Sequence, residues 1–133
     1  MGSFSDYLEL EVLDHIFKVG AYTPATHLYV ALAKSTITDA HTGTTIPSEV
    51  SGGSYARKIC DTWDVAATGS TKNTAPIIFA QATAAWGVVT DFAIIDGLTL
   101  GNIIGYGKLG SAKTIDSGDI PKFATADLKV KLD

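Results

Sequence analysis

The sequence predicts a mainly β fold: a β-sandwich of jelly-roll or immunoglobulin-like type, or a small barrel, with about seven to eight strands and one N-terminal α-helix. Only residues 4–18 repeat apolar side chains at helical spacing. After Gly20 the chain becomes rich in Thr, Val, Ile, Ala and Gly, and short alternating stretches are separated by turn-forming residues. Many short strands of this spacing are typical of sandwiches and barrels. We expect residues 1–133 to form one domain.

The predicted helix spans about residues 4–18. Ser3 or Ser5 is a candidate N-cap, and Gly20 is the expected terminator. At 100° per residue the apolar side chains form two adjacent strips, one with Phe4, Leu8, Val12 and Ile16 and one with Leu10, Leu13 and Phe17. One sheet contact does not normally cover so much apolar surface. We therefore expect either two partners for the helix, or burial beneath a broad sheet and a covering loop.

The first strand signal after the helix covers residues 27–34. Apolar residues occupy both alternating faces there, which favours a central strand buried on two sides. Residues 35–53 then form a long polar loop rich in Thr and Gly, with Ile46 and Pro47 as apolar residues within it. A loop of this length suggests contact with a neighbouring molecule.

The rest of the chain is predicted to form short strands joined by turns. Residues 66–74 favour a turn, and the Asp96-Gly97 and Gly101-Asn102 pairs predict a hairpin around them. At the C-terminus Leu128, Val130 and Leu132 alternate with polar residues, as in a strand with one buried face. The further expected strands cover residues 55–63, 76–80, 87–95, 103–109 and 113–115.

Charge and hydropathy argue against nucleic acid and membrane partners. Ten basic and fourteen acidic residues give a formal net charge of −4, which provides no electrostatic attraction to a phosphate backbone. Arg57-Lys58, a local basic pair, is interpreted as part of a solvated strand face. The longest apolar runs, such as residues 75–80, are far shorter than the ~20 residues of a membrane helix.

No residue pattern indicates catalysis, a cofactor or a metal. Residues 105–110 match the dinucleotide-binding pattern G-x-G-x-x-G, but no helical period follows them. We therefore expect a β-bulge or close strand packing at Gly105 and Gly107. The three histidines lack the short spacings of zinc sites, and Cys60, the single cysteine, is expected to be a buried apolar residue.

A series of short segments lies in a fixed order and spacing along the chain: residues 6–9, 13–15, 21–24, 28–32, 50–57, 73–75, 86–87, 101–107, 117–119 and 126–128, with Thr90. In this order of segments the chain resembles a family of small tailed-phage virion proteins, often labelled tail fibre or minor structural protein. The resemblance spans nearly the whole chain and departs from the family pattern at residues 44–49, which look like an insertion. The family offers no catalytic residues to carry over.

The resemblance implies a non-enzymatic virion protein, assembled in the host cytoplasm, whose partners are other virion proteins, a major capsid or tail protein, and further copies of itself in a trimer or dimer. The first hypothesis is an accessory capsid cement or decoration subunit. The alternative is a tail-fibre or tail-tip component for host attachment, and a third is a small-ligand or glycan-binding sandwich that uses Trp63 or Trp86. The candidate assembly surface comprises Phe4, Leu8, Leu10, Val12, Leu13, Ile16, Phe17, Ile46 and Pro47.

Overall fold

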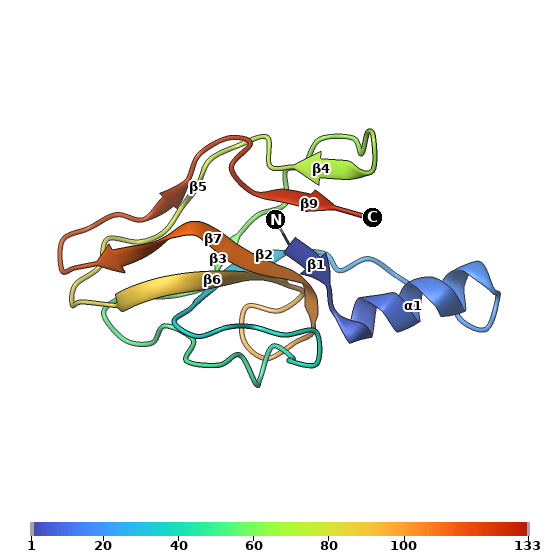
Figure 1. Cartoon of the computed structure of the whole chain (residues 1–133), viewed down its shortest axis with the longest axis horizontal. Helices are drawn as coiled ribbons and strands as arrows, with labels where there is room; N and C mark the ends of the chain where they lie inside the picture. The colour runs from blue at the N-terminus through green and yellow to red at the C-terminus, as the bar shows by residue number, and fades with distance from the viewer. Residues whose placement is uncertain (1, 133) are drawn as a thin grey trace.

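The computed structural model describes residues 2–132 and is mainly β, with nine strands and one helix in that part of the chain (Figure 1). This confirms the predicted fold class. The elements are β1 (Gly2–Phe4), α1 (Asp6–Ile16), β2 (Tyr29–Ala33), β3 (Lys58–Ile59), β4 (Ser70–Lys72), β5 (Ile77–Ile78), β6 (Gly87–Ile95), β7 (Ile103–Ile115), β8 (Lys122–Phe123) and β9 (Lys129–Lys131).

Seven of the strands form one sheet in the order β3-β2-β6-β7-β1-β9-β4, and β5 pairs with β8 in a small second sheet. The long β6–β7 hairpin lies at the centre of the seven-stranded sheet. The turn signals around residues 96–102 predict this hairpin. All pairs in the large sheet are antiparallel except β1 with β9. β1, which the sequence did not predict, thus connects the hairpin to the C-terminal strands.

The two faces of the sheet carry separate clusters of buried side chains. On one face Val30, Phe92 and Ile94 pack with Phe79 and Trp86 from the segment that contains β5. This arrangement is sandwich-like, with the β5–β8 pair as part of the second layer. On the other face Ala31 and Ala33 of β2 and Ala93 and Ile95 of β6 lie beneath the long loop. The buried Asp91 carboxylate of β6 accepts the N–H of Ile37 from that loop. The prediction that β2 is buried on both sides is therefore confirmed.

Residues 35–53 fold back onto the body. Ile37 and Ile46 of this loop are 3% and 9% exposed and pack against Ile95 and Ile103 of the sheet. Because these side chains complete the second face, the loop is a third layer of the fold and Ile46 is part of the core.

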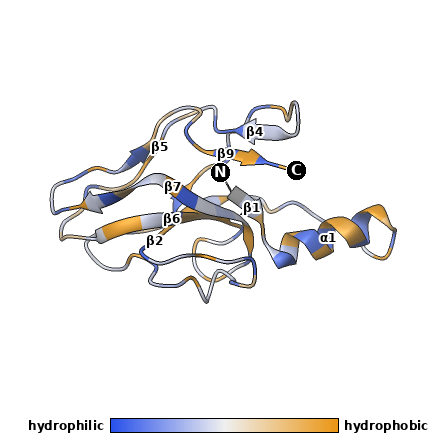
Figure 2. Cartoon of the chain, in the orientation of Figure 1, coloured by the Kyte–Doolittle hydropathy of each residue, from blue (hydrophilic) through white to orange (hydrophobic). Residues whose placement is uncertain are grey.

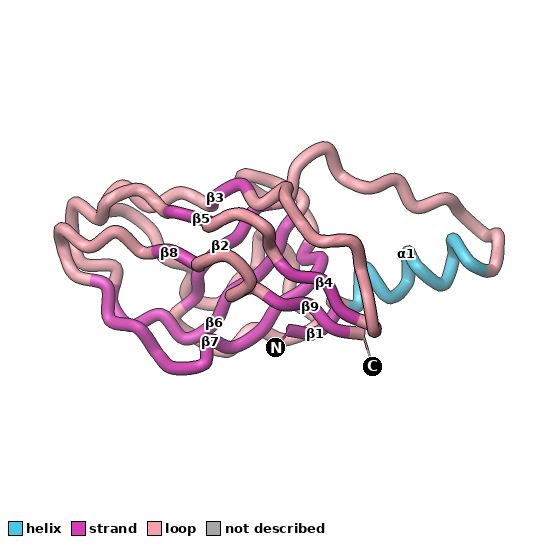
Figure 3. The backbone as a smooth tube through the Cα atoms, turned by 90° about the horizontal axis from the view of Figure 1, so that it is seen from above, coloured by secondary structure: helices cyan, strands magenta, loops and turns pink. Residues whose placement is uncertain are grey.

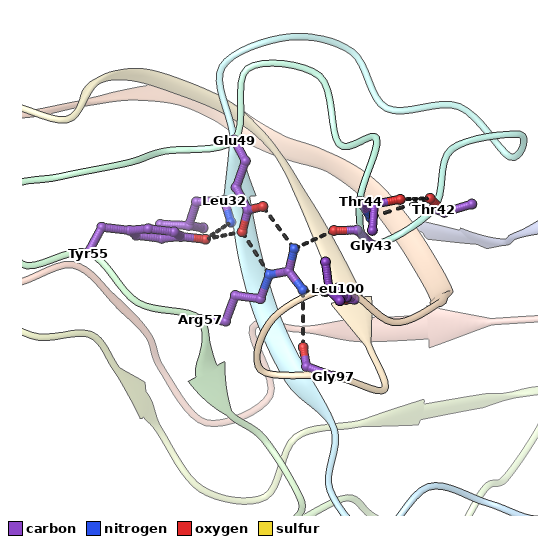
Figure 4. Close-up of polar contacts among 9 residues, drawn as sticks. All are labelled: Leu32, Thr42, Gly43, Thr44, Glu49, Tyr55, Arg57, Gly97 and Leu100. Atoms are coloured by element: carbon purple, nitrogen blue, oxygen red, sulfur yellow. Dashed lines mark hydrogen bonds and ion pairs between the residues drawn. The ribbon is translucent and has the colours of Figure 1, made fainter.

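Arg57 holds the long loop and the β6–β7 turn together (Figure 4). Its Nε and Nη2 donate to the Glu49 carboxylate at 2.8 and 2.9 Å, Nη1 donates to the carbonyls of Gly97 and Leu100, and Nη2 also donates to Gly43 O. A guanidinium has five N–H groups, and each has an acceptor here. The interpretation of Arg57 as part of a solvated face was therefore wrong: its side chain is 6% exposed.

Tyr55 extends this network toward β2. Its hydroxyl donates to Glu49 Oε1 at 3.0 Å and accepts the N–H of Leu32 at 3.0 Å. Burial, together with the neighbouring Glu49 carboxylate, raises the pKa of Tyr55. We call Glu49, Tyr55 and Arg57 the ionic clamp. It fixes two connections that have no regular secondary structure against the sheet.

Several predicted boundaries differ from the structure. In the region predicted as a strand at 55–63, only β3 is a strand, and Trp63 forms an isolated bridge with Asn73. Tyr55 and Arg57 bond through their side chains instead. Residues 113–115 do not form a separate strand but continue β7 beyond an irregularity opposite Val89 and Asp91. Residues 66–74 contain β4 as well as a turn.

Candidate assembly surface

α1 begins at a buried junction with the sheet. Ser5 is the N-cap: its hydroxyl accepts the N–H of Leu8 at 3.3 Å and donates to the carbonyl of Ile103 on β7. The side chain of Leu8 is 5% exposed and is the one buried residue of α1. Since β1 pairs with β7 directly before this junction, the start of the helix is fixed to the middle of the sheet.

Beyond this junction the helix leaves the body, and the chain returns beside it (Figures 1 and 3). The helix ends at Ile16, and Lys18 has the left-handed φ of 64° that reverses the chain. Val19 and Gly20 then donate to the carbonyl of Asp14. The predicted helix limits were two residues too long at each end, and the terminator is Lys18 and not Gly20. We call residues 6–28 the arm.

The outer part of the arm exposes a continuous apolar surface. Leu10, Leu13, Ile16 and Phe17 are 63%, 52%, 61% and 72% exposed, and Figure 2 shows orange bands along α1. The sequence left open whether two partners, or a broad sheet with a covering loop, would bury the helix. Within this chain neither the sheet nor a loop covers these four side chains. These four side chains are therefore the exposed part of the candidate assembly surface.

The structure separates the remaining candidate residues into buried and partly buried groups. Leu8 and Ile46 lie in the chain's own core and are removed from the surface that we propose. Phe4, Val12 and Pro47 are partly exposed. Val19, which the sequence did not single out, is 79% exposed and extends the surface past the helix end.

A groove that sequence reasoning missed lies between β7 and residues 119–129. It has a volume of about 810 Å³. Phe92, Phe123 and Leu128 are among its apolar residues, and four lysines also line it: Lys108, Lys113, Lys122 and Lys129. The lysines gave no sequence signal, since only the fold brings β7 and residues 119–129 to one cavity.

The dinucleotide-like motif lies within β7, with no helix after it. Gly105 pairs with Phe4 of β1, and a Cβ there would lie 3.2 Å from the carbonyl oxygen of Ser3. Close strand packing at Gly105, as predicted, is therefore confirmed. The motif is a place where two backbones approach each other.

Residues 2–132 contain no cluster of three metal-ligating side chains. Each histidine there has a local partner: His27 pairs with Asp61, and the Nδ1 atoms of His15 and His41 accept backbone N–H groups. Within the same residues no helix has the length and apolar character to cross a membrane.

Cys60 and the tryptophans are parts of the packing. Burial raises the pKa of the Cys60 thiol to about 12, which leaves it protonated at neutral pH. Trp86 is 2% exposed and donates to Gly53 O, and Trp63 packs against the same core and donates to Cys60 O. The Trp86 indole is therefore buried, whereas that of Trp63 is partly exposed.

The chain was compared with curated proteins and with models of protein families. No curated protein shows significant similarity to the chain. A family model described as podophage GP4 fiber I protein gp80 matches residues 3–131, from β1 through the arm and the groove to β9. The resemblance to tailed-phage virion proteins is thereby confirmed. The chain belongs to the podophage GP4 fiber I protein gp80 family, a family of phage virion structural proteins.

Proposed function

We propose that this protein is a non-enzymatic subunit of a tail fibre, joined to other virion proteins through its arm. The observation that carries the proposal is the family match over residues 3–131, whose description names a fibre. The arm supports it, because its four exposed apolar side chains would be removed from water by contact with another protein. The capsid cement hypothesis gains no support from the family.

The location can be tested by cryo-electron microscopy of particles that carry this protein. We expect its density on the tail, with the arm directed toward a neighbouring protein. Density distributed over the capsid shell, with none on the tail, would instead establish the cement function.

A second experiment addresses host attachment. Purified protein added before infection should reduce phage adsorption if the body of the subunit contacts the host. Particles that lack the protein but adsorb at the normal rate would limit the role to assembly within the tail.

A further inference from the structure

We propose that the arm of one copy of this chain docks into the lysine-lined groove of a second copy, so that copies associate head to tail. The inference rests on the proposed use of the arm for assembly but not on the location of the protein in the particle. Three features carry it: the pattern of the arm, the lining of the groove, and their separation in the molecule.

The arm presents an apolar ridge with acidic flanks. Leu10, Leu13 and Phe17 follow one another at helical spacings of three and four residues, so their side chains form one line along α1. At 100° per residue Glu9 lies on one side of this line and Asp14 on the other. In the described part of the chain neither carboxylate forms an ion pair, so both are available to a cationic partner.

The groove has the complementary composition. Its interior is apolar, and its volume of about 810 Å³ lies within the range that binding pockets span. Lys113, Lys122 and Lys129 form no ion pair with residues 2–132. Of the two carboxylates in the lining, Asp119 accepts the N–H of Asp116 and Asp127 accepts that of Ala124. The Lys108 ammonium donates to Thr36 of the long loop, which does not line the groove. The other three lysines against two turn-capping carboxylates leave the lining with an excess of one positive charge.

The occupant has to come from another copy. No residue before Leu32 lines the groove, and the arm extends from the side of the body opposite the end of β7 (Figure 1). A second copy supplies an apolar ridge flanked by acids for an apolar groove lined by lysines. Because the two contacting surfaces differ, such contacts close into a ring or continue as a filament, depending on the rotation between copies.

The test is the association of the purified full chain, measured by sedimentation over a range of concentrations and at two salt concentrations. We expect concentration-dependent oligomers that weaken between about 0.05 and 0.5 M salt, since the charged flanks are screened. Leu13→Asp with Phe17→Asp in the arm should reduce the association constant at least about tenfold. Lys113→Glu with Lys122→Glu in the groove should do the same.

Two controls make the contact specific. Lys34→Glu with Lys58→Glu changes two exposed lysines outside the groove and should leave association unchanged. A mixture of the arm variant and the groove variant retains one intact arm and one intact groove. It should therefore recover a heterodimer that neither variant forms by itself.

The proposal is overturned if the wild-type chain stays monomeric at all concentrations. This holds also if the monomer binds another virion protein. It is also overturned if the arm variant dissociates the oligomer but the groove variant does not, because arms would then contact some other surface. Failure of the mixed variants to pair would refute it as well. Circular dichroism should show that each variant keeps the wild-type fold, as expected for substitutions at exposed positions.

Discussion

Replacement of Arg57 tests whether the ionic clamp stabilises the fold. In Arg57→Ala five hydrogen bonds are lost, and the Glu49 carboxylate keeps only the Tyr55 hydroxyl as a side-chain partner. Removal of one member of a buried ion pair costs about 3–5 kcal/mol. Since the Glu49 side chain is 23% exposed and can recover some hydration, we expect the lower end, about 3 kcal/mol.

The assay is urea unfolding followed by circular dichroism, with thermal unfolding beside it. A loss of about 3 kcal/mol corresponds to a decrease of roughly 10 °C in Tm for a domain of this size. Lys58→Ala, at the exposed neighbouring position, is the matched control and should change stability by less than about 0.5 kcal/mol.

A double-mutant cycle isolates the pair. Glu49→Gln combined with Arg57→Ala should cost less than the sum of the two single changes, because both remove the same interaction. Hydrogen exchange gives a local measurement: the amides near Gly97 and Leu100 should exchange faster in Arg57→Ala. A stability loss below about 0.5 kcal/mol, with additive single changes, would refute the clamp as a stabilising element.

Further predictions concern pH and backbone packing. The pKa of Cys60 is raised to about 12 and that of Tyr55 is also raised, so the folded state holds both protons more tightly than the unfolded state. The contribution of these two groups to the free energy of unfolding is complete below about pH 8.5 and is lost as the pH rises toward 12. From Cys60 alone, the free energy of unfolding falls by about 1 kcal/mol per pH unit in this range. Urea midpoints should therefore fall above pH 9, and Cys60→Ala should flatten that decline; a constant midpoint would contradict it. Gly43→Ala should cost about 2 kcal/mol or more in urea unfolding, because its Cβ would overlap the carbonyl oxygen of Leu100, whereas Gly110→Ala meets nothing within 4 Å and should cost less than about 0.5 kcal/mol. Equal effects of these two alanines would show that the turn can move away from the loop.

Strong local periodicity predicted the β6–β7 hairpin and β2, where alternating side chains and turn residues agree. It failed where side chains replace backbone pairing. Arg57 and Tyr55 lie in a stretch that alternates like a strand, yet their bonds go to Glu49 and to loop carbonyls far along the chain. Such long-range pairing has no local signal.

The candidate surface was predicted in part for a similar reason. Helical periodicity identified Leu10, Leu13 and Phe17 as a strip, but it could not show that only the first part of the helix, at Leu8, lies against the sheet. Leu8 is covered because Ser5 and β1 fix the first turn of the helix to β7. Ile46 was assigned to the surface because it lies in a long polar loop, and that loop proved to cover the sheet.

The connection from β1 to α1 has a mechanical consequence. β1 is paired with β7 on one side and with β9 on the other, and the chain passes from it directly into the arm. A pull on the arm along the chain therefore acts along the length of β1, so its pairs with β7 are sheared together and not opened one after another. The other end of the arm leads at residue 28 into β2, so a subunit held by this arm would carry load through two strands of its sheet. The ionic clamp lies beside this path, because the Tyr55 hydroxyl accepts the N–H of Leu32 on β2.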